Sequence, residues 1–342
     1  MPAKVSLRPL VVIVALLVAL PAGAVTIPVI RVRAPDNPPD SRSGNCVSAN
    51  CGSVGYTYFI AKHEVSNSQY AEFLNSTARS DPFGLYNTSM GSDGTYGGIT
   101  RSGEDGSYSY EAKQDFEDKP VVYVSFYDAL RFANWLNNGT PDTESGAYTI
   151  TGPGIADNSI TRNTGAGVFL PSENEWYKAA YYRFGGVYFD YPTGANTRPI
   201  CVPPVFDNGN AANCSPVDVL TDVGAYVFSA SWLGTFDQGG NAFEWNEQVV
   251  DFGNRSVRGG GSDGLDSLLH AVNWGSYDPT SEFYNLGFRI AGNPGGPLPE
   301  SGAALLGLVA LSSLLGLTAS RRHRNPSTRG FVCPRYSAEP RR

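Results

Sequence analysis

Apolar residues are concentrated in two blocks near the ends of the chain, and between these blocks they recur at helix or strand spacing only in short stretches. The first block, 10–20, follows a basic start, and the second, 303–319, precedes a basic cluster. Apolar blocks next to basic residues are typical of segments that are recognised at a membrane. The pattern therefore divides the chain into two terminal signals and a body.

The N-terminal block has the layout of a secretory signal peptide over residues 1–24. Lys4 and Arg8 supply the positive start. Ala22 and Ala24 place small side chains where a signal peptidase cleaves, and the apolar run is too short for a permanent membrane span. We expect cleavage after Ala24 and an exported protein.

The C-terminal block resembles a sorting tail over residues 293–324. Pro299-Glu300-Ser301 precedes the apolar run, and the arginines that follow would stay on the cytoplasmic side. The tail resembles the PEP-CTERM signals that exosortases recognise, with Ser301 in place of the second proline. It also resembles the LPXTG signal of sortases, so the identity of the sorting peptidase stays open. We expect a cell-envelope or extracellular protein that its C-terminal segment anchors in the membrane, transiently or stably. Residues 325–342 form an extension without an assigned role.

The first part of the body, residues 25–55, is rich in Pro, Asn, Ser and Gly and has few apolar clusters. This composition is typical of a linker. Apolar residues then predict short strands at 56–60 and 121–124. We expect the linker to lead into one folded domain over residues 56–292.

Three helices are expected between long loops. Ser66, Ser125 and Ser172 can each cap a helix, because apolar residues recur at helical spacing after each serine. Gly, Ser, Asn and Asp dominate 81–118 and 183–297, where regular structure should be sparse. With 39 glycines and 12% aromatic residues, the domain should be held by loops and aromatic packing rather than by long elements.

The body is strongly acidic. The two terminal regions hold nine of the 25 basic residues and one of the 32 acidic residues, which leaves 16 basic and 31 acidic residues and a net charge of −15. A negative field of this size repels nucleic acid and anionic membrane surfaces, whereas it attracts divalent cations. We therefore expect no nucleic-acid partner.

Cysteine spacing predicts two disulfides. Cys46 lies near Cys51, and Cys201 lies near Cys214, which suits short-loop disulfides in an oxidising compartment. A metal site is the weaker interpretation, because neither pair has the two-residue spacing of a zinc site. Cys333 lies beyond the apolar C-terminal run.

Six sequence blocks, in order, resemble the formylglycine-generating (sulfatase-modifying-factor) enzymes. They lie at 63–70, 120–129, 170–176, 240–245, 257–262 and 285–289. The resemblance implies an α+β fold, related to C-type lectin-like domains and poor in regular structure. In such a fold Trp135, Trp176 and Trp245 are interpreted as large apolar anchors, and Arg258 and Arg289 as buried, paired arginines.

The resemblance also implies a calcium site. Segment 237–244 matches a calcium-binding segment of the family, which implies the side chains of Asp237 and Glu244 with the carbonyls of Gly240 and Ala242. Hard cations need several oxygens around one point, and a glycine-rich turn lets carbonyls join the carboxylates. Calcium is therefore the expected cofactor.

The copper chemistry of the family is not expected. Those enzymes hold copper with two cysteine thiolates between the Gly-Gly-Ser turn and the Gly-Phe-Arg motif, and soft Cu(I) selects such ligands. The corresponding interval, 263–286, contains no cysteine. His270 lies in this interval and is the first catalytic candidate, although a lone histidine is more often a structural hydrogen-bonding group.

Two functions remain open. A calcium-stabilised extracellular module that binds a glycan, peptide or matrix component predicts a cleft lined by Trp274, Tyr277 and Asn273. We favour this function.

The alternative is an oxygen-dependent oxidoreductase of the formylglycine-generating type with an altered active site. It predicts a convergent metal or acid-base group around His270, Asp263 and Asp266.

Overall fold

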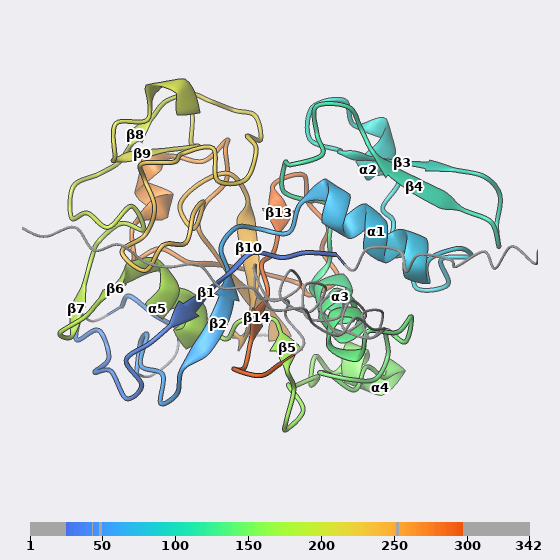
Figure 1. Ribbon diagram of the computed structural model, residues 1–342, viewed down its shortest axis with the longest axis horizontal. Coiled ribbons are helices and arrows are strands. Elements are labelled where there is room, and N and C mark those ends of the chain that lie inside the picture. Colours follow the sequence, from blue (N-terminus) through green and yellow to red (C-terminus); the bar gives the residue numbers. More distant parts are fainter. Residues whose placement is uncertain (1–24, 43, 48–49, 251–252, 297–342) are drawn as a thin grey trace, which may run out of the picture. The chain divides into compact units, whose positions relative to one another are not determined.

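Two four-stranded sheets and three helices of nine or more residues organise the part of the chain that the computed structural model describes (Figure 1). The described residues are 25–42, 44–47, 50–250 and 253–296. The predicted signal peptide, the apolar run of the sorting tail and Cys333 lie outside them. Among the described residues, no helix is long and apolar enough to cross a membrane.

The first sheet joins the two ends of the described chain. Its strands, in spatial order, are β1 (Val29–Val32), β2 (Tyr58–Ala61), β14 (Ala291–Gly292) and β5 (Val168–Phe169). All neighbours pair antiparallel. The expected linker over 25–55 is therefore wrong, because β1 pairs with β2 along its whole length. Loop-like composition did not reveal a strand whose partner lies 26 or more residues away.

The second sheet lies in the region where little regular structure was expected. Its strands, in spatial order, are β12 (Gly275–Tyr277), β11 (Arg255–Arg258), β10 (Phe243–Val249) and β13 (Leu286–Gly287). β13 pairs parallel to β10, and the other pairs are antiparallel. This sheet places Trp245 and Arg258 in the interior, where both are fully buried.

The three expected helices are confirmed. They are α1 (Asn67–Thr77), α3 (Phe126–Asn138) and α5 (Glu173–Tyr181). Ser66, Ser125 and Ser172 each accept a hydrogen bond from the third residue of their helix, and that residue's side chain bonds back to the cap. Four short helices are α2 (Ser89–Ser92), α4 (Gly152–Ala156), η1 (Pro204–Phe206) and η3 (Asp266–Leu269).

The expected strand at 121–124 is absent, because this segment bonds to two different loops instead of to one strand. Val121 N–H donates to the carbonyl of Val65, whereas Tyr123 N–H donates to that of Phe283. The remaining strands form two-stranded pairs: β3 (Ile99–Ser102) with β4 (Ser109–Ala112), β6 (Tyr182–Arg183) with β7 (Val187–Tyr188), and β8 (Ile200–Cys201) with β9 (Ala211–Ala212). The hairpin of β3 and β4 interrupts the long loop expected at 81–118.

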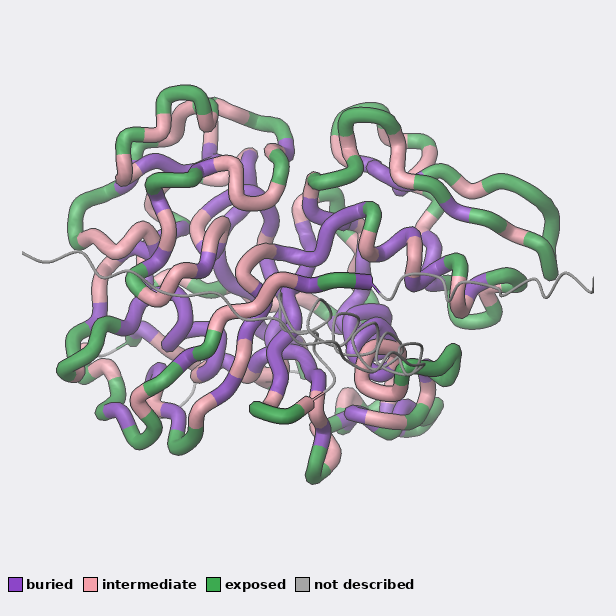
Figure 2. The backbone as a smooth tube through the Cα atoms, in the orientation of Figure 1, coloured by how far each residue is buried: buried purple, intermediate pink, exposed green. Residues whose placement is uncertain are grey.

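The largest apolar core lies between the first sheet, α1 and α3, where the tube in Figure 2 is mostly buried. Phe132 of α3 packs against Phe73 and Phe288 at ring distances of 5.3 Å each. Of the tryptophans expected to be anchors, Trp176 and Trp245 are fully buried. Trp135 is partly buried, and its indole N–H donates to Ser76 Oγ at 3.0 Å. Aromatic packing therefore holds this α+β fold, as the composition predicted.

Candidate functional site

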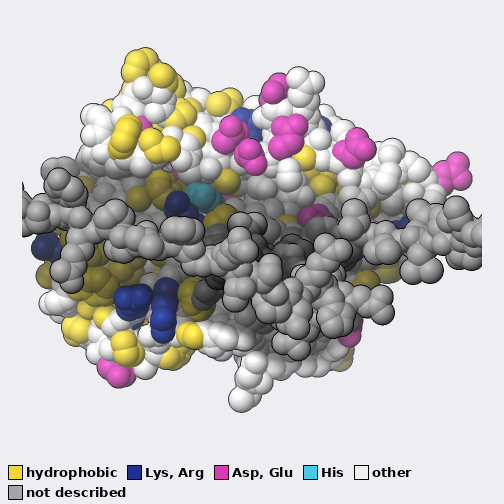
Figure 3. Space-filling view, viewed as in Figure 1, with side chains coloured by type: hydrophobic (Ala, Val, Ile, Leu, Met, Phe, Trp, Pro, Cys, Tyr) yellow, Lys and Arg dark blue, Asp and Glu magenta, His cyan; other side chains and the backbone are white. Residues whose placement is uncertain are grey.

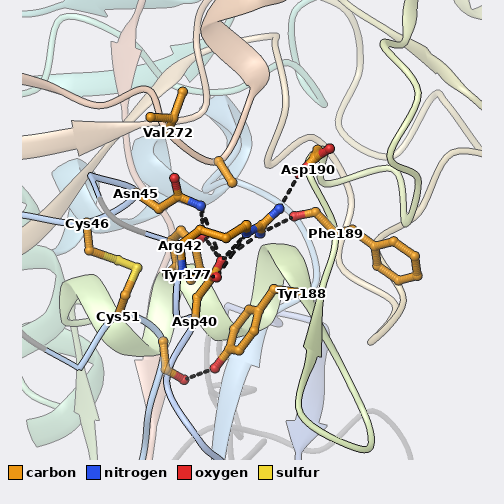
Figure 4. A network of polar contacts seen from close by, with 12 residues as sticks. Asp40, Arg42, Asn45, Cys46, Cys51, Tyr177, Tyr188, Phe189, Asp190 and Val272 are labelled. Atoms are coloured by element: carbon orange, nitrogen blue, oxygen red, sulfur yellow. Dashed lines mark hydrogen bonds and ion pairs between the residues drawn. A yellow bond between two sulfur atoms is a disulfide. The ribbon is translucent and has the colours of Figure 1, made fainter.

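A polar network fastens the segment before β2 to α5 (Figure 4). Arg42 forms ion pairs with Asp40, at 2.6 Å, and with Asp190. The hydroxyl of Tyr177, on α5, donates to the same Asp40 carboxylate at 2.7 Å. These contacts lower the pKa of Asp40, even though its burial acts in the opposite direction. The segment between β1 and β2 is thus part of the folded domain.

Both predicted disulfides are present. Cys46 is joined to Cys51 in the loop beside the Arg42 network (Figure 4). Cys201, at the end of β8, is joined to Cys214, which follows β9. Each disulfide closes a short loop, of the kind found in oxidising compartments.

Two buried ion pairs support the second sheet, as the sequence predicted for the arginines. Arg289 donates to both carboxylate oxygens of Glu244 at 2.6 Å each. Arg258 donates to Glu173 Oε1 at 2.5 and 2.9 Å. All four side chains are at most 1% exposed. Each guanidinium therefore compensates a carboxylate that burial would otherwise destabilise.

The predicted calcium ligands do not converge on a cation. Trp176 Nε1 adds a third hydrogen bond to Glu244, at 2.7 Å, so Arg289 already supplies the positive charge at this carboxylate. Asp237 accepts a hydrogen bond from Gly224 N–H at 2.5 Å, and burial raises the pKa of Asp237 to about 6. A hard cation needs several free, ionised oxygens around one point. Glu244 does not fit that role, and we derive no calcium-dependent step.

We expect a calcium chelator to change the thermal midpoint of unfolding by less than about 2 °C. A calcium ion at 100 times its dissociation constant would stabilise the protein by about 2.7 kcal/mol, which exceeds such a shift. Differential scanning calorimetry with calcium and with EDTA measures the difference. A drop of several degrees, together with stoichiometric calcium in elemental analysis, would show that Glu244 can bind the ion.

His270, the first catalytic candidate, lies at the end of η3. Its Nδ1 accepts a hydrogen bond from Val272 N–H at 3.1 Å, and its Nε2 lies 3.9 Å from Asp190 Oδ1. Its ring meets the edge of Tyr191 at a centroid distance of 5.1 Å. The histidine is therefore part of a local turn and of the surroundings of the Arg42 network.

The acids that an altered enzyme would need do not join His270. Asp263 accepts hydrogen bonds from Tyr284, at 2.7 Å, and from Asn285. Asp266 faces Arg198 at 3.5 Å. Within residues 25–296, leaving out the undescribed positions, no group of three His, Cys, Asp or Glu side chains is placed to hold a metal. The convergent group predicted by the alternative function is not formed.

A shallow pocket of about 110 Å³ forms in the interval where copper enzymes of the resembling family carry their thiolates. Trp274, Tyr277 and Asn273 line it, as the binding hypothesis predicted. Trp274 keeps 40% of its surface exposed. The pocket also includes Phe243 and Leu268, which the sequence interpretation missed because they lie on different elements.

Arg258 fixes the loop that carries Trp274. Its Nη1 donates to the carbonyls of Ala271, at 2.8 Å, and Asn273, at 2.9 Å. The pairing of β12 with β11 holds the residues that follow, with Gly275 opposite Val257. The exposed indole is thus presented from a braced loop.

A second exposed apolar surface lies on the loops next to β8 and β9, at the upper left of Figure 3. Its members are Val205, Phe206, Val227 and Phe228, each 60% exposed or more. Asp207 accepts hydrogen bonds from Phe228 N–H, at 2.7 Å, and from Ser229 Oγ, at 2.5 Å, which ties the two loops together. Apolar groups gathered this way mark contact surfaces.

Comparison with solved structures agrees with the fold. The crystal structure of CarF matches with a TM-score of 0.50 and 22% identity, covering 78% of this chain and 98% of that chain. Treponema denticola variable protein 1 (TM-score 0.47, 16% identity) and PvdO from Pseudomonas aeruginosa (TM-score 0.42, 16% identity) each cover 78% of this chain, and 95% and 92% of their own. No curated protein matches the sequence significantly.

The family relationship rests on a model that matches most of the chain. The model of the sulfatase-modifying factor enzyme 1-like domain matches residues 19–294, which include all six resembling blocks and both sheets. The expected formylglycine-generating-enzyme-like fold is thereby confirmed. The chain belongs to the FGE-sulfatase family, that of the sulfatase-modifying factor enzyme 1-like domain.

Proposed function

We propose that this chain is an exported, non-catalytic binding module that takes a glycan or a peptide in the shallow pocket between β11 and β12. The observation that carries the proposal is the exposed indole of Trp274 on a braced loop, beside Tyr277 and Asn273. A rigid aromatic side chain offers a large contact area at little entropic cost, and the amide of Asn273 can choose an orientation.

The chemistry of the pocket favours binding over catalysis. Segment 263–286 contains no cysteine, so two thiolates cannot hold copper there. His270, Asp263 and Asp266 each have separate partners. Calcium stabilisation is not part of the proposal, because Arg289 neutralises Glu244.

Export and anchoring complete the proposal. The signal-peptide pattern of 1–24 and the sorting-tail pattern of 293–324 support a location in the cell envelope or outside the cell. An exosortase-like peptidase, or alternatively a sortase, would process the tail. Two disulfides suit such a compartment.

We expect Trp274→Ala to weaken ligand binding at least about tenfold, which corresponds to ~1.4 kcal/mol, because the indole supplies the main contact area. The purified full-length chain would first be screened against oligosaccharides of cellulose, chitin and xylan and against a random peptide array. Titration calorimetry with the best ligand then compares the variants.

Trp232→Ala is the matched control. Trp232 is 50% exposed, stacks against Arg183 and lies outside the pocket, so this variant should bind like the wild type. Equal weakening in both variants, or no weakening with Trp274→Ala, would remove the pocket from the binding site. Oxygen uptake with a cysteine-containing peptide would favour the oxidoreductase instead.

A further inference from the structure

A second cavity, of about 320 Å³, lies between the residues before β1, the start of α1 and the turn at 222–223. None of its lining residues lines the pocket beside Trp274. Its volume falls at the lower end of the range of small-molecule sites. The cavity can therefore hold a compact ligand independently of the proposed glycan or peptide site.

Glu64 presents an unpaired carboxylate oxygen in the wall of this cavity. Its side chain belongs to a residue that is only 2% exposed, and Oε1 has no hydrogen-bond partner. Oε2 receives one long hydrogen bond, from Asn241 Nδ2 at 3.5 Å. Burying a polar atom without a partner costs free energy that a ligand with N–H donors recovers.

The charges around the cavity favour a cation. Asp118 and Asp222 join Glu64 in the lining, and no Lys or Arg is part of it. His63 also lines the cavity, but burial, together with Arg289 and Lys62, lowers its pKa to about 4, so its ring is neutral at pH 7. Three carboxylates and no lining cation give this space a negative potential.

The shape of the lining favours an organic cation over a metal ion. Ile27, Pro28 and Val223 supply apolar contacts. The carboxylates are not grouped for metal binding, since the described residues contain no set of three metal-ligating side chains. An ammonium group has three donors on a compact charge, and a short alkyl chain would contact the apolar wall.

We propose that this cavity binds a primary ammonium group carried on a short alkyl chain, with Glu64 Oε1 as the buried acceptor and Asp222 at the rim. Diamines and lysine side chains belong to this chemical class.

The proposal is tested with n-butylamine and 1,5-diaminopentane as probes, and with 1-butanol as the uncharged control. Titration calorimetry on the purified full-length chain should show binding of both amines and none of the alcohol. Glu64→Gln keeps the size of the side chain but removes its charge, and should weaken amine binding at least about tenfold. Asp222→Asn should weaken it about threefold, because this carboxylate is 62% exposed.

Asp105→Asn, in the exposed turn between β3 and β4, is the control for charge alone and should bind like the wild type. Circular dichroism checks that each variant is folded, and Asp222→Asn decides the question if Glu64→Gln does not fold. Equal affinity for the amines and the alcohol, no binding of the amines, or unchanged binding in Asp222→Asn and in folded Glu64→Gln would overturn the proposal. So would calcium alone displacing the amines through a tighter site. Loss of glycan binding in Trp274→Ala with intact amine binding would separate the two sites.

Discussion

Glu244→Gln is expected to lower the free energy of unfolding by about 3–5 kcal/mol, because it leaves the guanidinium of Arg289 buried without its counter-charge. Both side chains are fully buried, and two hydrogen bonds of 2.6 Å join them. Trp176 Nε1 also donates to this carboxylate, so its partner changes as well. Urea unfolding followed by near-ultraviolet circular dichroism measures the loss.

Two further variants show whether the loss comes from the unpaired charge. Glu104→Gln, in the exposed turn of the β3–β4 hairpin, should change the free energy by less than about 0.5 kcal/mol. Glu244→Leu combined with Arg289→Met removes both charges, and should cost less than Glu244→Gln alone. A double variant that is the less stable of the two would show that packing, rather than charge, dominates at this site.

Replacing Cys201 and Cys214 by serine is expected to lower the free energy of unfolding by about 3 kcal/mol. The disulfide closes a loop with a sequence separation of 13, and the cross-link restricts the unfolded chain. The pair Cys46 and Cys51 closes a shorter loop, with a separation of 5, so its removal should cost about 2 kcal/mol.

Urea unfolding of both double-serine variants, without reductant, compares the two disulfides. Adding a reductant to the wild type should reproduce the sum of the two losses. If removal of the shorter loop proves the more costly, the Arg42 network beside it must depend on that disulfide, and chain entropy would not be the main term.

Local signals predicted the helices well. Each of Ser66, Ser125 and Ser172 is followed within a few residues by the cap partner and by the apolar face, so the information lies in one short window. Strands were predicted less well, because their partners are distant. β1 in 25–55 was missed, and 121–124 was taken for a strand although its two N–H groups bond to separate loops.

The candidate site shows the same division. The family resemblance located segment 263–286, and its aromatic residues sufficed to predict the lining by Trp274 and Tyr277. The predicted role of Glu244 failed to fit because its real partner, Arg289, lies 45 residues further on. Phe243 and Leu268 could have been found only from the pairing of distant elements.

The position of β14 controls when this protein can fold. β14 lies between β2 and β5, so the first sheet is incomplete until residues 291–292 arrive. Contacts between residues this far apart in the sequence form slowly, and the exposed edges of β2 and β5 invite wrong pairing in the meantime. For a chain that crosses a membrane from its N-terminus, nearly the whole domain would have to emerge before the sheet closes. Translocation in the unfolded state is therefore compatible with this topology, and chaperones on the far side would have a defined strand edge to protect.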